Sequence, residues 1–259
     1  MSMRNTTLSG DKPVIAIGDI HGEATLLETI LWDLEQRGSE TNGVRIVTLG
    51  DYSDRGNESR QVLERLIQGP SIAGNEYVHI LGNHDMMMLE AYRYPKEIPA
   101  QRWFMVGGIQ TLISYGLNDE DDLYDGNWRK LIPEEHIDFL SRMPLIVETE
   151  EHILVHAGLR PGVSLKEQNA HDLTWIRQEF LDSEYDFGRL VIHGHTITRQ
   201  PALRVNRIGI DTGAHQNGIL TAVLLNETPE FIQAVQQKDE LEPRIREWTY
   251  ELITNPVPG

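Results

Sequence analysis

Three short apolar runs in the first third of the chain each lead into a glycine followed by a residue with a side-chain oxygen. The runs span residues 14–17, 44–49 and 77–81. The oxygen-bearing residues are Asp19, Asp51 and Asn83, and both intervals, 51 − 19 and 83 − 51, equal 32 residues. A continuous apolar run of this length is typical of a strand buried on both faces, and apolar residues at helical spacing follow each run. The pattern predicts repeated right-handed strand–helix units on a parallel or mixed sheet.

The middle of the chain has a different pattern. Residues from about 95 to 150 contain several prolines and no clear strand, so we expect a mostly helical insertion in which Trp103 and Trp128 pack. Further strands are predicted at 153–155, 190–192, 207–210 and 220–224. We therefore expect a single α/β domain over residues 11–235. The ranges 1–10 and 236–259 are expected to be terminal segments, the second one charged and loosely packed.

The composition excludes several classes of protein. The chain has 259 residues, with 40 acidic and 23 basic side chains, which gives a net charge of −17. A broad nucleic-acid surface needs clustered Lys and Arg, so no nucleic-acid partner is expected. No apolar run approaches the roughly 20 residues of a membrane span, and we expect no membrane partner. The absence of cysteine excludes thiolate metal sites and fits a cytoplasmic protein. The oligomeric state is not predicted.

Clusters of metal-binding residue types follow the first five predicted strands. They occupy residues 18–22, 50–56, 82–85, 156–158 and 193–196. Such positions converge at the carboxyl ends of adjacent strands, where ligands bind in open α/β sheets. Carboxylate, amide and imidazole ligands without sulfur suit Mn²⁺, Fe or Zn²⁺. These candidate ligands are more numerous than one tetrahedral metal ion needs. Asp51 follows the central one of the first three strands, so its carboxylate could bridge two ions. Two cations can hold both oxygens of a phosphoryl displacement.

The ordered motifs GDIHG, GDYSDRG, GNHD, HAG and GHT resemble the phosphoprotein phosphatase (PPP) family, particularly its small bacterial and phage-type members. The resemblance covers about residues 14–218. It implies a calcineurin-like metallophosphoesterase sandwich, in which central mixed β-sheets are flanked by helices in an α-β-β-α arrangement. It also implies hydrolysis of phosphoserine and phosphothreonine in proteins by direct attack of a metal-bridging hydroxide, and it leaves phosphotyrosine open as a further substrate. Two divalent ions per chain are expected, with Mn²⁺ preferred to Fe or Zn²⁺.

The resemblance also implies a role for individual residues. The expected metal ligands are Asp19, His21, Asp51, Asn83, His156 and His195. His84 resembles the family's general acid, and Asp54 resembles the carboxylate that orients it. Protonation of a poor alkoxide leaving group gives this pair a physical purpose. Arg55 resembles the phosphate-binding arginine, and Trp175-Ile176-Arg177 resembles the segment that supplies a second one. His193 is expected to have a supporting structural role rather than to bind metal.

Some features depart from the family pattern and leave alternatives open. The third motif ends in Asp85, where eukaryotic members have Glu, and the fourth reads HAG rather than HGG.

A symmetrical diadenosine tetraphosphate hydrolase that releases ADP is the alternative enzyme, since such enzymes share GDxHG and GNHD. They usually lack a carboxylate at the position of Asp54, which favours the phosphatase. A catalytically silent binding module is a third possibility, although no expected ligand or acid is missing. A nuclease is disfavoured by the acidic chain.

Overall fold

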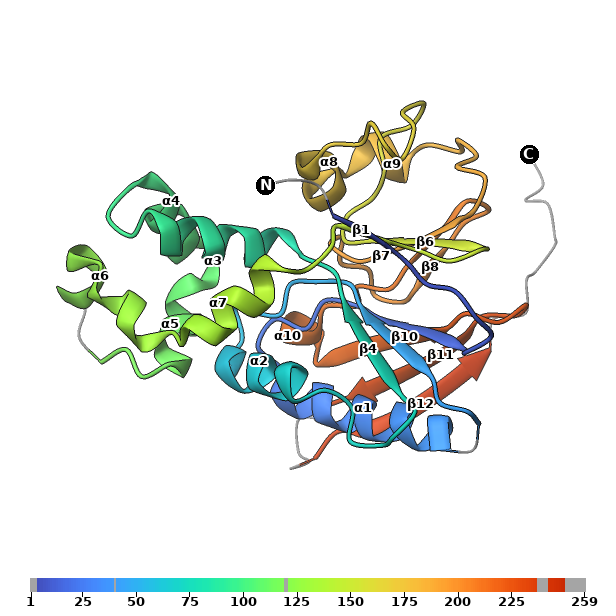
Figure 1. Cartoon of the computed structure of the whole chain (residues 1–259), viewed down its shortest axis with the longest axis horizontal. Helices are drawn as coiled ribbons and strands as arrows, with labels where there is room; N and C mark the ends of the chain where they lie inside the picture. The colour runs from blue at the N-terminus through green and yellow to red at the C-terminus, as the bar shows by residue number, and fades with distance from the viewer. Residues whose placement is uncertain (1–3, 40, 119–120, 237–241, 250–259) are drawn as a thin grey trace.

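Two six-stranded mixed sheets form the centre of the structure, a computed structural model that describes residues 4–39, 41–118, 121–236 and 242–249. The first sheet has the order β1 (Asn5–Thr7), β5 (Ile146–Glu148), β6 (His152–Val155), β7 (Leu190–His193), β9 (Arg207–Gly209) and β8 (Ala202–Leu203). The second has the order β12 (Arg244–Thr249), β11 (Glu230–Val235), β10 (Ile219–Leu224), β2 (Val14–Ile17), β3 (Arg45–Thr48) and β4 (Glu76–His79). Both sheets are visible in Figure 1.

The two sheets pack face to face across a shared apolar core. One buried cluster joins Ala16 and Val47 of the second sheet to Leu154 and Ile192 of the first. Apolar side chains on both faces explain why these strands read as continuous apolar runs rather than alternating ones. The seven strands predicted from the sequence are all present, with bounds that agree within two residues.

Helices cover the outer faces of both sheets. The helix α1 (Ala24–Ser39) packs on β10 and β11 of the second sheet, and α2 (Ser59–Gln68) lies beside it (Figure 1). Near the first sheet lie α8 (Ala170–Trp175) and α9 (Gln178–Leu181), and Phe180 of α9 contacts the His193 ring of β7. This α-β-β-α arrangement confirms the predicted fold class. The short α10 (Ala214–Asn217) precedes β10.

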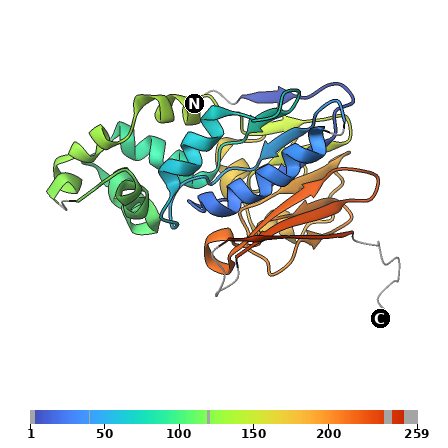
Figure 2. The same ribbon diagram turned by 90° about the horizontal axis from the view of Figure 1, so that it is seen from below.

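A group of helices projects beyond one end of the sheets, as Figure 2 shows from below. It comprises α3 (Asn83–Arg93), α4 (Ile98–Trp103), the π-helical turn η1 (Phe104–Gly108), α5 (Ile109–Ser114), α6 (Asp121–Asp125), the 3₁₀ turn η2 (Asn127–Leu131) and α7 (Glu134–Ser141). Trp103 and Trp128 are fully buried there, with ring centroids 5.4 Å apart, so both tryptophans pack inside the insertion as predicted. Across the part of the chain that the structure describes, no helix is both long enough and apolar enough to cross a membrane.

Among the described residues, five strands were not predicted, and most of them are short or lie at an edge. β5 lies inside the range expected to be helical, and its three residues are too few to give a periodic signal. β1 and β12 are edge strands that come from the two ranges expected to be terminal segments. β12 pairs with β11 over six residues, so the described part of the C-terminal segment is more firmly paired than its charge indicated. Charged edge strands are common because they discourage further pairing.

Candidate metal centre

The parallel strands carry their polar loops to one end of the sandwich. β2, β3 and β4 run parallel in one sheet, and β6, β7 and β9 run parallel in the other. The loops after β3 and β4 approach closely, because a Cβ on Gly50, whose φ is +104°, would lie 2.5 Å from the backbone nitrogen of Gly82. Only glycine fits this approach without displacing backbone atoms.

Left-handed backbone conformations mark the same loops. Among the described residues, five non-glycine residues have a positive φ, and all five belong to the predicted site. They are His21 (46°), Asp51 (52°), Asp54 (72°), Arg55 (68°) and His195 (63°). Such conformations cost energy for residues with a Cβ and cluster at functional sites. The backbone strain therefore indicates that these loops are built to orient side chains.

Asp51 lies at the junction of two clusters of buried side chains. In the first, ligand atoms of His21, Asp51 and His84 all lie within 4.8 Å of one another. His21 Nε2 is 3.4 Å from Asp51 Oδ2, while His21 Nδ1 is 2.9 Å from the carbonyl oxygen of Ser53. The carbonyl fixes the tautomer in which Nδ1 donates, so that the Nε2 lone pair faces the carboxylate.

In the second cluster, ligand atoms of Asp51, His156 and His195 also lie within 4.8 Å of one another. His156 Nε2 is 3.5 Å from Asp51 Oδ1 and 2.9 Å from Asn83 Oδ1. Its Nδ1 is held by the carbonyl oxygen of Leu49 at 2.8 Å. His195 Nε2 is buried, and no partner for it lies among the described residues. A buried nitrogen without a partner is costly unless a ligand satisfies it.

Asp19 belongs to neither cluster but joins the second through the backbone. Its carboxylate accepts the backbone N–H of His195 at 3.1 Å and 3.0 Å. Burial, together with the negative charges of Asp211 and Asp51, raises the pKa of Asp19 well above its ordinary value. Three carboxylates in one buried region leave negative charge that a divalent cation would neutralise.

The imidazoles have the protonation state that metal binding requires. Burial lowers the pKa of His21 to about 3 and that of His195 to about 2, and it also lowers the pKa of His156. These rings are therefore neutral near pH 7, and neutral imidazole is the metal-binding form. The oxygen and imidazole donors, the neutral state of the imidazoles and the unpartnered Nε2 of His195 all fit the binding of divalent cations.

His84 and Asp54 form a buried imidazole–carboxylate pair, with Nδ1 2.7 Å from Oδ2. Asp54 is fully buried, and two residues of the insertion donate to its carboxylate. Trp103 Nε1 donates to Oδ1 at 2.9 Å, and Thr111 Oγ1 donates to the same oxygen at 2.7 Å. These contacts could not be predicted from the sequence, because the two donors lie 49 and 57 residues from Asp54.

Asp85 is a second residue whose role the sequence did not reveal. Its carboxylate accepts the backbone N–H groups of Asp51 at 2.8 Å, Tyr52 at 3.1 Å and Gly82 at 3.0 Å. Burial and the nearby Asp51 charge raise the pKa of Asp85 to about 7. Asp85 thus fixes the loop that carries Asp51. The available signal was its place at the end of GNHD, where eukaryotic members of the PPP family have Glu.

The two predicted phosphate-binding arginines have different surroundings. Arg55 is half-buried, and its Nη2 lies 2.8 Å from His84 Nε2. Arg177 is exposed, and its charge lowers the pKa of both His156 and His195. His193 lies in neither cluster and contacts Phe180.

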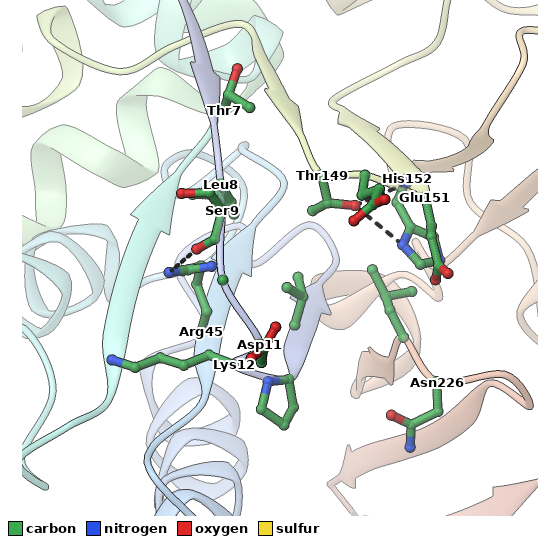
Figure 3. A pocket seen from close by; sticks show the side chains of 15 residues that line it. Thr7, Leu8, Ser9, Asp11, Lys12, Arg45, Thr149, Glu151, His152 and Asn226 are labelled. Carbon is green, nitrogen blue, oxygen red and sulfur yellow. Dashed lines mark hydrogen bonds between the residues drawn. The ribbon is translucent and has the colours of Figure 1, made fainter.

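Two pockets lie at opposite ends of the sandwich. A pocket of about 240 Å³ adjoins the metal-binding clusters and is lined by His21, Arg55, Ile197, Gly213, His215 and Gln216. A larger one of about 640 Å³ lies near the amino ends of β2, β3 and β6 and includes Arg45 and His152 (Figure 3). None of the predicted site residues lines the larger pocket, and its Arg45 is already paired with Glu76. The predicted site residues therefore gather at the end with the smaller pocket.

Two sheets with buried imidazole clusters that share a carboxylate define a metallophosphoesterase. Residues 12–199 match the family model described as calcineurin-like phosphoesterase, and the chain belongs to that family. This confirms the predicted resemblance. The chain is therefore a hydrolase of phosphoric esters whose fold implies divalent metal ions.

Individual relatives differ in their named substrates. The chain is 27% identical to the asymmetrical bis(5'-nucleosyl)-tetraphosphatase PrpE of Anoxybacillus flavithermus, covering 80% of this chain and 88% of that protein. It is 30% identical to serine/threonine-protein phosphatase 2 of Escherichia coli, covering 79% and 89%. A crystal structure described as a putative diadenosine tetraphosphatase has a TM-score of 0.64 at 20% identity, covering 95% and 98%. That likeness supports the fold.

Proposed function

We propose that the chain is a protein phosphatase that removes phosphate from phosphoserine and phosphothreonine in cytoplasmic proteins. The observation that carries this proposal is the buried pair of His84 and Asp54, with Nδ1 2.7 Å from Oδ2. An alkoxide of serine or threonine is a poor leaving group unless it is protonated. An imidazole held by a carboxylate is suited to protonating the alkoxide. Symmetrical diadenosine tetraphosphate hydrolases usually lack a carboxylate at the position of Asp54.

Two cations, preferably Mn²⁺, would be held by the predicted ligands. We assign Asp19 and His21 to one ion, Asn83, His156 and His195 to the other, and Asp51 to both. His84 also lies in the first cluster, but both of its ring nitrogens have partners, Asp54 and Arg55. This supports its assignment as an acid rather than a ligand. When bound, a cation pair supplies positive charge for phosphoryl oxygens and lowers the pKa of water.

The remaining site residues would bind and protonate the substrate. Arg55 and Arg177 would donate to phosphoryl oxygens, and a guanidinium matches two of them at once. His84 would give the proton on Nε2 to the ester oxygen as the phosphorus–oxygen bond breaks. Asp54 would stabilise the imidazolium through Nδ1. Trp103 and Thr111 would keep the Asp54 carboxylate in place.

Hydrolysis of diadenosine tetraphosphate is the second candidate. It is favoured by the similarity to the asymmetrical tetraphosphatase of Anoxybacillus flavithermus over most of the chain. The pocket beside Arg55, with His215 and Gln216 in its wall, offers polar contacts for further phosphates. The Asp54 carboxylate weighs only against the symmetrical enzyme. The buried pair of His84 and Asp54, which suits a poor alkoxide leaving group, keeps this candidate second.

The two candidates are separated by one assay with the purified, manganese-loaded protein. Phosphoserine and phosphothreonine peptides and diadenosine tetraphosphate are incubated separately, and products are resolved by chromatography. The proposal expects inorganic phosphate from the peptides at a higher kcat/KM than any nucleotide release. More efficient release of ADP, or of ATP and AMP, would overturn it, and so would intact peptides.

A further inference from the structure

Trp175 lies at the rim of the proposed catalytic site, beside His195. It is the last residue of α8, and its ring centroid is 6.0 Å from that of His195, with an interplanar angle of 79°. The side chain nevertheless stays 38% exposed. An indole that touches a proposed ligand and also faces solvent provides apolar surface where substrate must approach.

The support beneath Trp175 is rigid. Arg160 donates to both carboxylate oxygens of Asp172, at 2.6 Å and 2.7 Å, and Asn169 caps the helix by accepting the N–H of Asp172 at 2.9 Å. The N–H of Ala157, next to His156, donates to the carbonyl of Leu173 at 2.9 Å. The short helix is therefore tied to the same loop as a proposed metal ligand. A pre-organised side chain loses little entropy when it binds a ligand.

Arg177 follows two residues later and adds charge to this rim. It is exposed, and its charge acts on His156, His195 and Asp211. An aromatic surface and a guanidinium thus lie on the same side of the site. This combination suits a ligand in which a planar ring is joined closely to an anionic group.

The contact between Trp175 and His195 limits how far the ring can be from the phosphate. In an aryl phosphate the ring is bonded directly to the ester oxygen. In a dinucleotide the adenine is separated from the phosphates by a ribose. We propose that Trp175 binds the aromatic ring of phosphotyrosine and so determines a preference for aryl over alkyl phosphates. This rests on the proposed phosphatase function and extends its substrates from phosphoserine and phosphothreonine to phosphotyrosine, with the aryl preference expressed in KM.

The test compares two peptides that differ only in phosphotyrosine or phosphoserine, using the full-length manganese-loaded protein. The variants are Trp175→Ala, the conservative Trp175→Phe, and Trp32→Ala as the control. Trp32 is 68% exposed, and its helix α1 lies on the outer face of the second sheet (Figure 1). We expect Trp175→Ala to raise KM for the phosphotyrosine peptide about three- to tenfold. KM for the phosphoserine peptide and the bound metal should not change, and Trp175→Phe should restore most of the loss.

A binding measurement keeps the proposal testable without turnover. Calorimetry with phenylphosphonate and methylphosphonate, which cannot be hydrolysed, should show tighter binding of the phenyl compound. Trp175→Ala should remove that preference.

Three results with Trp175→Ala would overturn the proposal: an equal change in KM for both peptides, a loss of bound metal, or a change in KM for diadenosine tetraphosphate alone. Equal binding of phenylphosphonate and methylphosphonate by the unsubstituted protein would also overturn it. A protein that binds phenylphosphonate through Trp175 but releases no phosphate would instead contradict the proposed phosphatase function.

Discussion

Nη2 of Arg55 lies 2.8 Å from Nε2 of His84. An arginine can only donate, so Nε2 accepts here and Nδ1 carries the proton that is donated to Asp54. Burial disfavours the charged imidazole, but the negative charges of Asp51 and Asp54 outweigh it and raise the pKa of His84. In the proposed mechanism the ring would take up a second proton once Arg55 moves to a phosphate. Substrate binding and protonation of the proposed acid would then be coupled through one guanidinium.

Replacement of Arg55 by lysine should lower kcat/KM for all phosphomonoesters by roughly 10- to 100-fold, because hydrogen bonds to charged groups contribute about 1.5–3 kcal/mol. Steady-state kinetics measure the effect, and Arg60→Lys serves as the control, because Arg60 pairs with Glu64 on the surface of α2. An unchanged kcat/KM would contradict a phosphate-binding role for Arg55.

His84→Asn should lower kcat by roughly 10²–10⁴-fold, the usual contribution of a positioned acid. The loss should be smaller for p-nitrophenyl phosphate, whose leaving group needs little protonation, and bound metal should be retained. Elemental analysis and kinetics with two substrates provide the test, with His152→Asn at the opposite end of the sandwich as the control. Loss of metal would mean that His84 is a ligand instead.

Asp51→Asn should reduce the bound metal, since Asp51 belongs to both clusters. The neutral amide keeps the shape of the side chain but removes the negative charge shared by two cations. Metal content is measured after gel filtration and compared with that of Asp33→Asn, which alters a surface pair with Arg37. Retention of two ions per chain would show that Asp51 does not bridge them.

Trp103→Phe should remove one donor from the buried Asp54 carboxylate while leaving Thr111 in place. Loss of one hydrogen bond to a charged group costs about 1.5–3 kcal/mol of unfolding free energy, and kcat should fall less than in His84→Asn. Urea unfolding and kinetics measure the two effects. A loss of stability with an unchanged kcat would mean that Trp103 only packs.

The stability of the protein should decrease as the pH falls from 6.5 towards 4, in part because of His79. Burial lowers the pKa of His79 from 6.5 to about 4, beside the rings of Tyr52, Tyr77 and Phe139. In this window the unfolded chain binds a proton that the folded chain does not, so unfolding is favoured at lower pH. His79→Asn should therefore flatten the dependence of Tm on pH, measured with both proteins metal-free. Parallel curves would contradict this.

The sequence predicted the strands and the convergence of the motif loops because both follow from general rules. Buried parallel strands read as apolar runs, and their carboxyl ends meet at one edge. Asp19 and His195 illustrate this, since they are 176 residues apart but joined by a hydrogen bond. The family and the α-β-β-α fold were predicted correctly on this basis.

The contacts made by the insertion could not be predicted. Trp103 and Thr111 reach Asp54 only because the helices of the insertion pack over the loop that carries it, and helix packing leaves no local trace in the sequence. The backbone N–H of Arg55 donates to the carbonyl of Gly107 in the π-helical turn at 3.4 Å, a conformation that composition does not indicate. Short strands such as β5 were not predicted, because their pairing is determined by strands that are distant in the sequence.

Anomalous diffraction from crystals grown with manganese tests the central claim most directly. The claim is that Asp51 joins two metal sites, one beside His21 and one beside His156 and His195. We predict two peaks flanking the Asp51 carboxylate, roughly 3.5–4 Å apart as in other two-metal sites. Crystals with no peak at Asp51, or with manganese bound only elsewhere on the acidic surface, would contradict it.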